Sequence, residues 1–179
     1  QAYEFFVALA AADSNLAQAL RAHWGFVEDL LSRPADQAEF VERWLSRIGD
    51  GIIAGNAITE RGNAHGDGST VLLHRDGQWI LNGTKFYSTG TGYADVILVA
   101  AIGDDDEPAS LIVAADAPGV EIIDDWDGFG QRLTASGTTH FRDVVIEDAD
   151  VFPPGHGLDS GDRTAFGQAT WQTVHLATL

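Results

Sequence analysis

Apolar positions recur at helical spacing along the first fifty residues of the chain. An alanine-rich apolar stretch over residues 2–12 predicts a buried helix. Asp13 and its polar neighbours interrupt that stretch and supply a cap for a second helix, which ends at Pro34. A third helix is predicted over residues 35–48, with Gly49 just beyond its C-terminus. One apolar face of the second helix consists of Leu16, Leu20, Trp24, Val27 and Leu31.

Beyond residue 50 the apolar pattern changes from a period near 3.6 to short alternating runs, which are typical of strands. Asp76-Gly77 is typical of a tight hairpin turn, and Asn82-Gly83 predicts a second turn. Many short strands separated by such turns predict an antiparallel barrel or sandwich. The predicted strands cover residues 51–58, 70–75, 78–84, 85–88, 96–102, 110–115, 120–124 and 138–146.

The order of these elements predicts an α+β chain in three parts. Residues 1–50 are expected to be part of an N-terminal helical domain, and residues 51–152 a middle β-domain. Residues 153–179 begin with a rigid proline-containing connector and are expected to continue as the first helix of a C-terminal helical domain. The roughly periodic apolar residues of that last helix are Phe166, Trp171, Val174 and Leu176.

Composition narrows the classes of function. The net charge is −17, and Lys85 is the sole lysine, so neither nucleic acid nor an anionic membrane is an expected partner. The absence of cysteine excludes disulfides and thiolate chemistry within these 179 residues. Without a long apolar run or a signal peptide, the protein is expected in the cytoplasm. The chain begins at Gln1 and contains no methionine, which predicts an internal fragment of a longer protein.

The stretch from Trp79 to Gly90 is the candidate for binding chemistry. It ends in a cluster of small hydroxyl and glycine residues that begins at Ser88. Glycine lets a backbone approach a flat ligand closely, and free hydroxyls can bond to it. The alternative is an ordinary β-meander that closes in a glycine-rich turn.

Two motifs carry a family resemblance. The first is the run Leu81-Asn-Gly-Thr-Lys, followed by Ser88-Thr-Gly and Ala94-Asp95. The second is Asp125-Trp-Asp-Gly-Phe-Gly-Gln-Arg-Leu-Thr-Ala-Ser-Gly-Thr-Thr. Together they resemble the middle β-domain of acyl-CoA dehydrogenase-fold flavoproteins. The second motif is most similar to the dibenzothiophene-desulfurisation monooxygenases, a branch that uses reduced flavin from a separate reductase.

The resemblance implies a set of flavin-binding residues in this sequence. It assigns cofactor contacts to Asn56, Thr59, Ser88 and Thr89, and places the Ser88 hydroxyl near the reactive edge of the flavin as a catalytic group. The Gly-Ser-Asp element that usually follows Thr-Glu in the dehydrogenases is missing after Glu60, which favours the monooxygenase branch. The alternative for Asn56 and Ser88 is a role in their own turns.

Other residues are assigned with competing alternatives. The resemblance places Trp126 at the border of flavin and substrate, Trp24 near the substrate, and His23 in the site as a catalytic proton carrier. The alternatives are packing of the indoles and a surface or interface role for His23. Arg132 is expected to pin its turn, and no metal site is expected because the histidines show no ligand-like spacing.

The reading favoured by the motifs is a flavin-dependent monooxygenase that uses reduced FMN and O2 to oxygenate a hydrophobic aromatic or organosulfur substrate. A separate flavin reductase and a homodimer or homotetramer are the partners that the resemblance implies. The alternative enzyme is an acyl-CoA dehydrogenase with FAD. A non-catalytic β-module that binds a partner is a third hypothesis, which the flanking helices disfavour.

Overall fold

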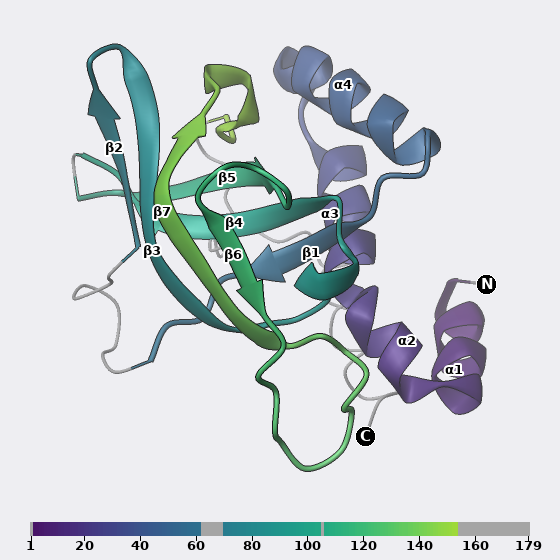
Figure 1. The fold of residues 1–179 in the computed structure, drawn as a ribbon. Coiled ribbons are helices and arrows are strands. Elements are labelled where there is room, and N and C mark those ends of the chain that lie inside the picture. Colours follow the sequence, from purple (N-terminus) through teal and green to yellow (C-terminus); the bar gives the residue numbers. More distant parts are fainter. Residues whose placement is uncertain (1, 62–69, 105, 154–179) are drawn as a thin grey trace.

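The computed structural model describes residues 2–61, 70–104 and 106–153 (Figure 1). The helix predicted after residue 162 lies outside these ranges, and the three-part domain division remains a prediction. No helix in the described ranges is long and apolar enough to cross a bilayer. The helices are α1 (Ala2–Ala12), α2 (Ser14–Ala19), α3 (Arg21–Ser32) and α4 (Ala38–Gly49), with a short 3-10 turn, η1 (Ala35–Gln37), before α4.

Two details of the helical part differ from the sequence prediction. The predicted second helix is divided at Leu20 into α2 and α3, because the ψ of −2° at Leu20 departs from the value of a regular α-helix. Helix α4 includes Gly49 and is capped by Asp50, and the residue with positive φ is Gly51 at +102°. Gly51 therefore takes the place just past the helix end that the sequence had suggested for Gly49.

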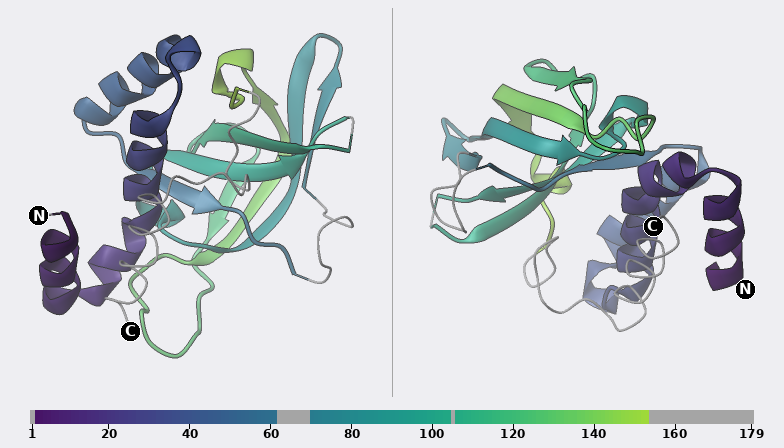
Figure 2. Two further views of the ribbon diagram at one scale, coloured as in Figure 1. Left: turned by 180° about the vertical axis from the view of Figure 1, so that it is seen from behind. Right: turned by 90° about the horizontal axis from the view of Figure 1, so that it is seen from below.

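The strands form one curled sheet beside the helices, as Figures 1 and 2 show, and the fold is α+β as predicted. The sheet is mixed rather than antiparallel, because β1 pairs with β4 in parallel. The strand order is β1-β4-β2-β3-β7-β6, and β5 pairs with β4. The strands are β1 (Ala54–Ala57), β2 (Val71–Arg75), β3 (Gln78–Ser88), β4 (Val96–Ile102), β5 (Pro108–Ala114), β6 (Val120–Ile123) and β7 (Gly137–Ile146).

Asn82-Gly83 is not a turn, and the two strands predicted around it are the single strand β3. The pairing of β3 with β7 shifts register between Leu81 and Gly83, which marks a β-bulge. Opposite it, Asp143 has φ +50°. The Asn82 amide donates to Asp143 Oδ1 at 3.0 Å and accepts from the Asp143 N–H at 2.9 Å. These side-chain bonds satisfy groups that the irregular ladder leaves unpaired, so a turn-like dipeptide fits inside a strand.

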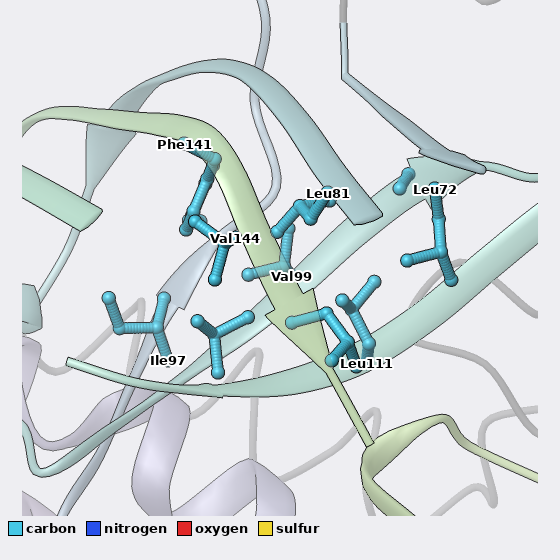
Figure 3. Packing of buried hydrophobic residues seen from close by; sticks show 11 residues of the cluster. Leu72, Leu81, Ile97, Val99, Leu111, Phe141 and Val144 are labelled. Atoms are coloured by element: carbon cyan, nitrogen blue, oxygen red, sulfur yellow. The ribbon is translucent and has the colours of Figure 1, made fainter. Parts of the chain in front are cut away.

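Alternation along β4 and β5 divides the core into two clusters. One face of the two strands carries Ile97, Val99 and Leu111, which pack inside the curled sheet with Leu72, Leu81, Phe141 and Val144 (Figure 3). The other face carries Leu98 and Ile112, which pack against helices α3 and α4 through Phe26, Leu30 and Trp44. Strands β4 and β5 are therefore buried on both faces, which explains their continuous apolar sequences.

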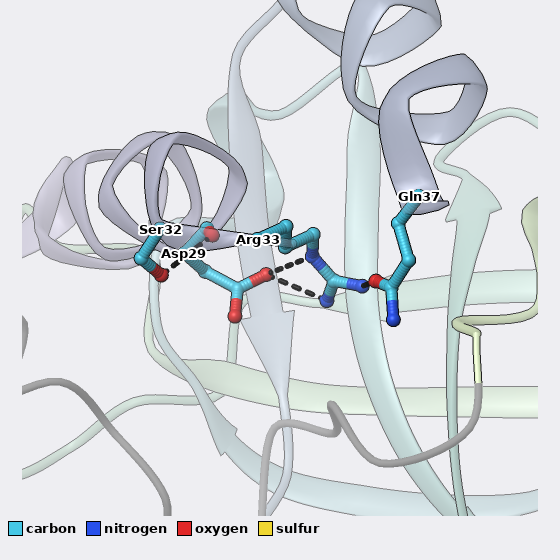
Figure 4. Close-up of polar contacts among 4 residues, drawn as sticks. All are labelled: Asp29, Ser32, Arg33 and Gln37. Atoms are coloured by element: carbon cyan, nitrogen blue, oxygen red, sulfur yellow. Dashed lines mark hydrogen bonds and ion pairs between the residues drawn. The ribbon is translucent and has the colours of Figure 1, made fainter. Parts of the chain in front are cut away.

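A buried arginine joins the helices to the chain that leaves the sheet. The Arg33 side chain is fully buried, and its Nε and Nη2 donate to Asp29 Oδ2 at 2.8 and 2.7 Å (Figure 4). Its Nη1 donates to Gln37 at 2.8 Å. The guanidinium also lies 4.9 Å from the Phe40 ring centroid and 4.8 Å from that of Phe152. A planar fork can make these bonds and stack at the same time, whereas an ammonium cannot.

We expect Arg33→Lys to lower the free energy of unfolding by about 2 kcal/mol, because the buried charge remains while its fork and stacking are lost. Urea unfolding checks this. The matched control is Arg75→Lys on the exposed end of β2, where the change should stay within about 0.5 kcal/mol. Equal effects in the two variants would show that the Arg33 contacts add nothing to stability.

Candidate functional site

The end of β3 departs from regular strand geometry where the site residues begin. Lys85 pairs with Thr139 and Ser88 with Gly137, so β3 carries one residue more than β7 between these pairs. Tyr87 accommodates the additional residue of β3 by adopting a φ of +57°. Phe86 and Tyr87 therefore do not alternate between faces as a regular strand requires. Both rings contact one guanidinium, that of Arg61, at 4.4 and 5.3 Å.

Beyond this bulge, hydroxyl side chains form a buried polar cluster. Ser88 is fully buried, and its Oγ has no hydrogen-bond partner among the described residues. Thr89 Oγ1 accepts from Ser136 Oγ at 3.0 Å, and Ser136 lies 2.8 Å from Thr134 Oγ1. Thr91 Oγ1 donates to the Ser88 carbonyl at 2.8 Å. The hydroxyls of two motifs far apart in the sequence thus meet in one place.

Strand β1 brings Asn56 to the same cluster. The Asn56 N–H donates to the Thr89 carbonyl at 3.2 Å, whereas its side-chain Oδ1 is buried with no partner among the described residues. A Cβ on the neighbouring Gly55 would lie 2.9 Å from the Thr91 backbone, so only glycine permits this approach. The structure therefore places Asn56, Ser88 and Thr89 close together, and their contact with a cofactor remains a prediction.

Gly90 is the point at which the surrounding elements meet. Its φ is +80°, and a Cβ there would lie 2.4 Å from the Ala19 carbonyl oxygen at the end of α2. Its N–H donates to the Thr134 carbonyl at 2.9 Å. The backbone at Gly90 thus contacts both a helix end and the loop between β6 and β7.

His23 on α3 reaches the start of β1, two residues before Asn56. The Ala54 N–H at the start of β1 donates to His23 Nδ1 at 3.3 Å, which leaves the proton of the neutral ring on Nε2. Burial lowers the pKa of His23 below its ordinary value. The adjacent Trp24 packs edge-on against Phe5 and Phe6, and its buried Nε1 has no partner among the described residues.

Trp126 lies in the loop of residues 124–136, which extends from β6 towards α2 in Figure 1. Asp125 joins the two ends of this loop, because its carboxylate accepts from the N–H and the hydroxyl of Thr138, both at 2.7 Å. These bonds lower the pKa of Asp125. The Trp126 Nε1 donates to the Gly130 carbonyl at 3.4 Å, and its ring stands perpendicular to Tyr87 with centroids 6.0 Å apart.

Thr59 and Arg132 both lie at the surface. Thr59 is exposed, and it meets β3 through its carbonyl, which accepts from the Phe86 N–H at 2.8 Å. Arg132 is also exposed and does not pin its turn through backbone carbonyls; the described contact of its guanidinium is a 3.5 Å ion pair with Asp127.

Sequence reasoning missed the buried ion pair beside the cluster. The Lys85 Nζ donates to Glu60 Oε1 at 2.6 Å and to the Ile58 carbonyl at 3.1 Å, and only 4% of the lysine side chain is exposed. A sole lysine in a strongly acidic chain was the available signal. Among the described residues, no group of three histidines or carboxylates could hold a metal ion.

Comparison with known proteins supplies the family. Residues 56–144 match the model of the acyl-CoA dehydrogenase middle domain. A dibenzothiophene monooxygenase of Rhodococcus erythropolis is 35% identical over 103 residues, which are 50% of this chain and 25% of that protein. The amino sugar nitrososynthase RubN8 of Streptomyces rubradiris is 32% identical over 172 residues, 90% of this chain and 38% of that protein.

A solved structure is also similar to this chain. The complex of TdsC from Paenibacillus sp. A11-2 with FMN and indole superposes with a TM-score of 0.72 and 30% identity, over 84% of this chain and 38% of that one. The chain thus spans between a quarter and two fifths of the length of these relatives. The chain belongs to the acyl-CoA dehydrogenase-like family, whose middle domain it carries over residues 56–144.

Proposed function

We propose that the protein containing this chain is a flavin-dependent monooxygenase, which uses reduced FMN and O2 to oxygenate a hydrophobic aromatic or organosulfur substrate. One observation carries the proposal: two buried polar atoms without described partners, Asn56 Oδ1 and Ser88 Oγ, lie on adjoining segments at the end of β1 and β3. Buried polar groups are nearly always hydrogen-bonded, so orphans that lie on adjoining segments point to a ligand.

The donor set fits an isoalloxazine ring. The ring edge offers N–H donors as well as nitrogen and oxygen acceptors. Asn56 Oδ1 would accept from an N–H, and the Ser88 hydroxyl would donate to an acceptor on the ring. Thr89 adds a hydroxyl whose position is fixed by Ser136. When bound, reduced flavin supplies the reaction with O2, and the protein supplies orientation and exclusion of water.

His23 would act as the proton donor or acceptor near the substrate. Its Nδ1 accepts from the Ala54 N–H, so Nε2 carries the proton of the neutral ring and would donate a hydrogen bond. The neutral ring would take up a proton at Nδ1 after losing the Ala54 bond, and the imidazolium so formed would donate a proton from Nε2. Trp24 and Trp126 would supply apolar walls, and Thr59 would contribute through its backbone near Phe86.

The relatives support this class of reaction but not one substrate. A similar protein over half of this chain is named for dibenzothiophene, and a similar protein over 90% of it is named for an amino sugar. We infer a separate reductase as the source of reduced FMN, and a homodimer or homotetramer as the assembly. The family name makes an FAD-dependent acyl-CoA dehydrogenase the second candidate, since a putative one from Bacillus subtilis is 28% identical over 109 residues.

The first test separates the two enzymes. The full-length protein should consume O2 only when an NADH-dependent reductase supplies reduced FMN, and it should not oxidise acyl-CoA with an artificial electron acceptor. Oxygen uptake and dye reduction are the two measurements. Bleaching of a stably bound FAD by acyl-CoA, with no need for O2, would exclude the monooxygenase.

Ser88→Ala should slow oxygenation by one to two decades, because a lost hydrogen bond to the flavin costs about 1–3 kcal/mol. Hydrogen peroxide released without product should rise. The control is Thr70→Val, which removes another fully buried hydroxyl that lacks a described partner, before β2. If the rate of oxygenation and the share of O2 that ends in product are unchanged in Ser88→Ala, the hydroxyl does not contact the flavin.

In the His23→Gln variant, the free energy of unfolding should fall less steeply than in the unmodified protein as the pH is lowered into mild acid. The folded pKa lies below 6.5, so between that folded pKa and 6.5 the unfolded chain binds a proton that the folded chain does not. In that window the free energy of unfolding rises with pH, and above it this contribution is constant. Urea unfolding from about pH 5 to 8 measures the slope. The exposed His74→Gln is the control, and an unchanged slope in His23→Gln would contradict the burial of His23.

A further inference from the structure

Tyr87 is held in a conformation that a tyrosine rarely adopts. Its φ is +57°, in the left-handed region, yet 47% of the residue is exposed, so the conformation does not serve to bury the ring. Backbone strain of this kind is found mainly at binding and active sites. The bulge turns the ring out of the alternation of β3 and towards Trp126.

Trp126 forms the second wall of an open aromatic corner. Its ring is perpendicular to Tyr87, at 90° with centroids 6.0 Å apart. The indole covers Gly128, where a Cβ would lie 2.1 Å from the ring, and its Nε1 bonds to Gly130. The loop thus holds the ring in place, and two perpendicular ring faces leave a corner that a third flat group can fill.

Arg61 brings positive charge to this corner. The Cζ of its guanidinium lies over the Phe86 and Tyr87 rings, at 4.4 and 5.3 Å from their centroids. In residues 2–61, 70–104 and 106–153, no carboxylate lies within ion-pair distance of Arg61. By contrast, Arg33, Arg43 and Arg142 each pair with an acid at 2.6–2.7 Å. The nearby Asp125 interacts electrostatically with Arg61, but its carboxylate accepts two bonds from Thr138 and does not form an ion pair with the guanidinium.

We propose that Arg61, Tyr87 and Trp126 form a subsite for a flat, negatively charged group of the substrate, such as an aryl carboxylate or aryl sulfinate. One of the two perpendicular rings would stack on the aryl plane and the other would meet it edge to face. The guanidinium would bind the anion through paired N–H donors. This inference rests on the proposed function and narrows its substrate class from hydrophobic aromatics to aromatic acids.

Binding of an isosteric probe pair tests the subsite in the full-length protein. The probes are 2-naphthoate, which is anionic, and 2-naphthamide, which is neutral, titrated by calorimetry. The unmodified protein should bind the naphthoate about tenfold more tightly, as expected for a charge-assisted pair. Arg61→Gln should remove that preference and leave the affinity for naphthamide unchanged. Arg132→Gln, at another exposed arginine of the same region, should keep the preference.

Tyr87→Asn is the second variant of this test. Asparagine tolerates positive φ, so the substitution removes the ring and keeps the backbone conformation. It should weaken both probes and keep the ratio between them. Equal affinity for the two probes in the unmodified protein, or an unchanged preference in Arg61→Gln, would overturn the proposal. So would an Arg61→Gln variant that binds FMN more weakly but riboflavin normally, since Arg61 would then serve the flavin phosphate. These titrations need no turnover, so they are independent of the test of oxygenation.

Discussion

The close approach of three chain segments at Gly90 is the constraint on which the candidate site depends. The site needs the end of α2, strand β1 and the loop of residues 124–136 to meet, and side chains would hold them apart. Gly90 removes that obstacle against Ala19, and Gly55 removes it against Thr91. The hydrogen bond from Gly90 to Thr134 then fixes the loop, so the hydroxyls of Thr89 and Ser136 come into contact.

The sequence located most of the described elements, and it singled out Asn56, Ser88 and Thr89, which the fold brings close together. Helical and two-residue periods located the helices and nearly all strands, because each buried face has to repeat with the geometry of its element. The errors fall where side chains or distant contacts override local preference. Asn82-Gly83 is typical of a turn, yet Asp143 on β7 bonds to Asn82 and keeps the strand continuous. No local pattern contains that partner.

The contacts at the rim of the site could not be predicted from the sequence either. Alternation along β3 separates Phe86 from Tyr87, but a register shift against β7 brings both rings to Arg61. A bulge depends on the count of residues in two strands, which a single strand does not reveal. The parallel pairing of β1 with β4 was missed for a similar reason, since the crossover that permits it is a property of the whole sheet.

The burial of Lys85 has a consequence for chemical probing. Amine-specific reagents act on accessible amines in their uncharged form, and this chain offers a single lysine whose side chain is 4% exposed and bonded to Glu60. Acylation of Lys85 therefore requires β3 to separate from the segment that ends in Glu60. Its labelling rate therefore reports how often the sheet opens beside the candidate site. No other lysine in these 179 residues competes for the reagent.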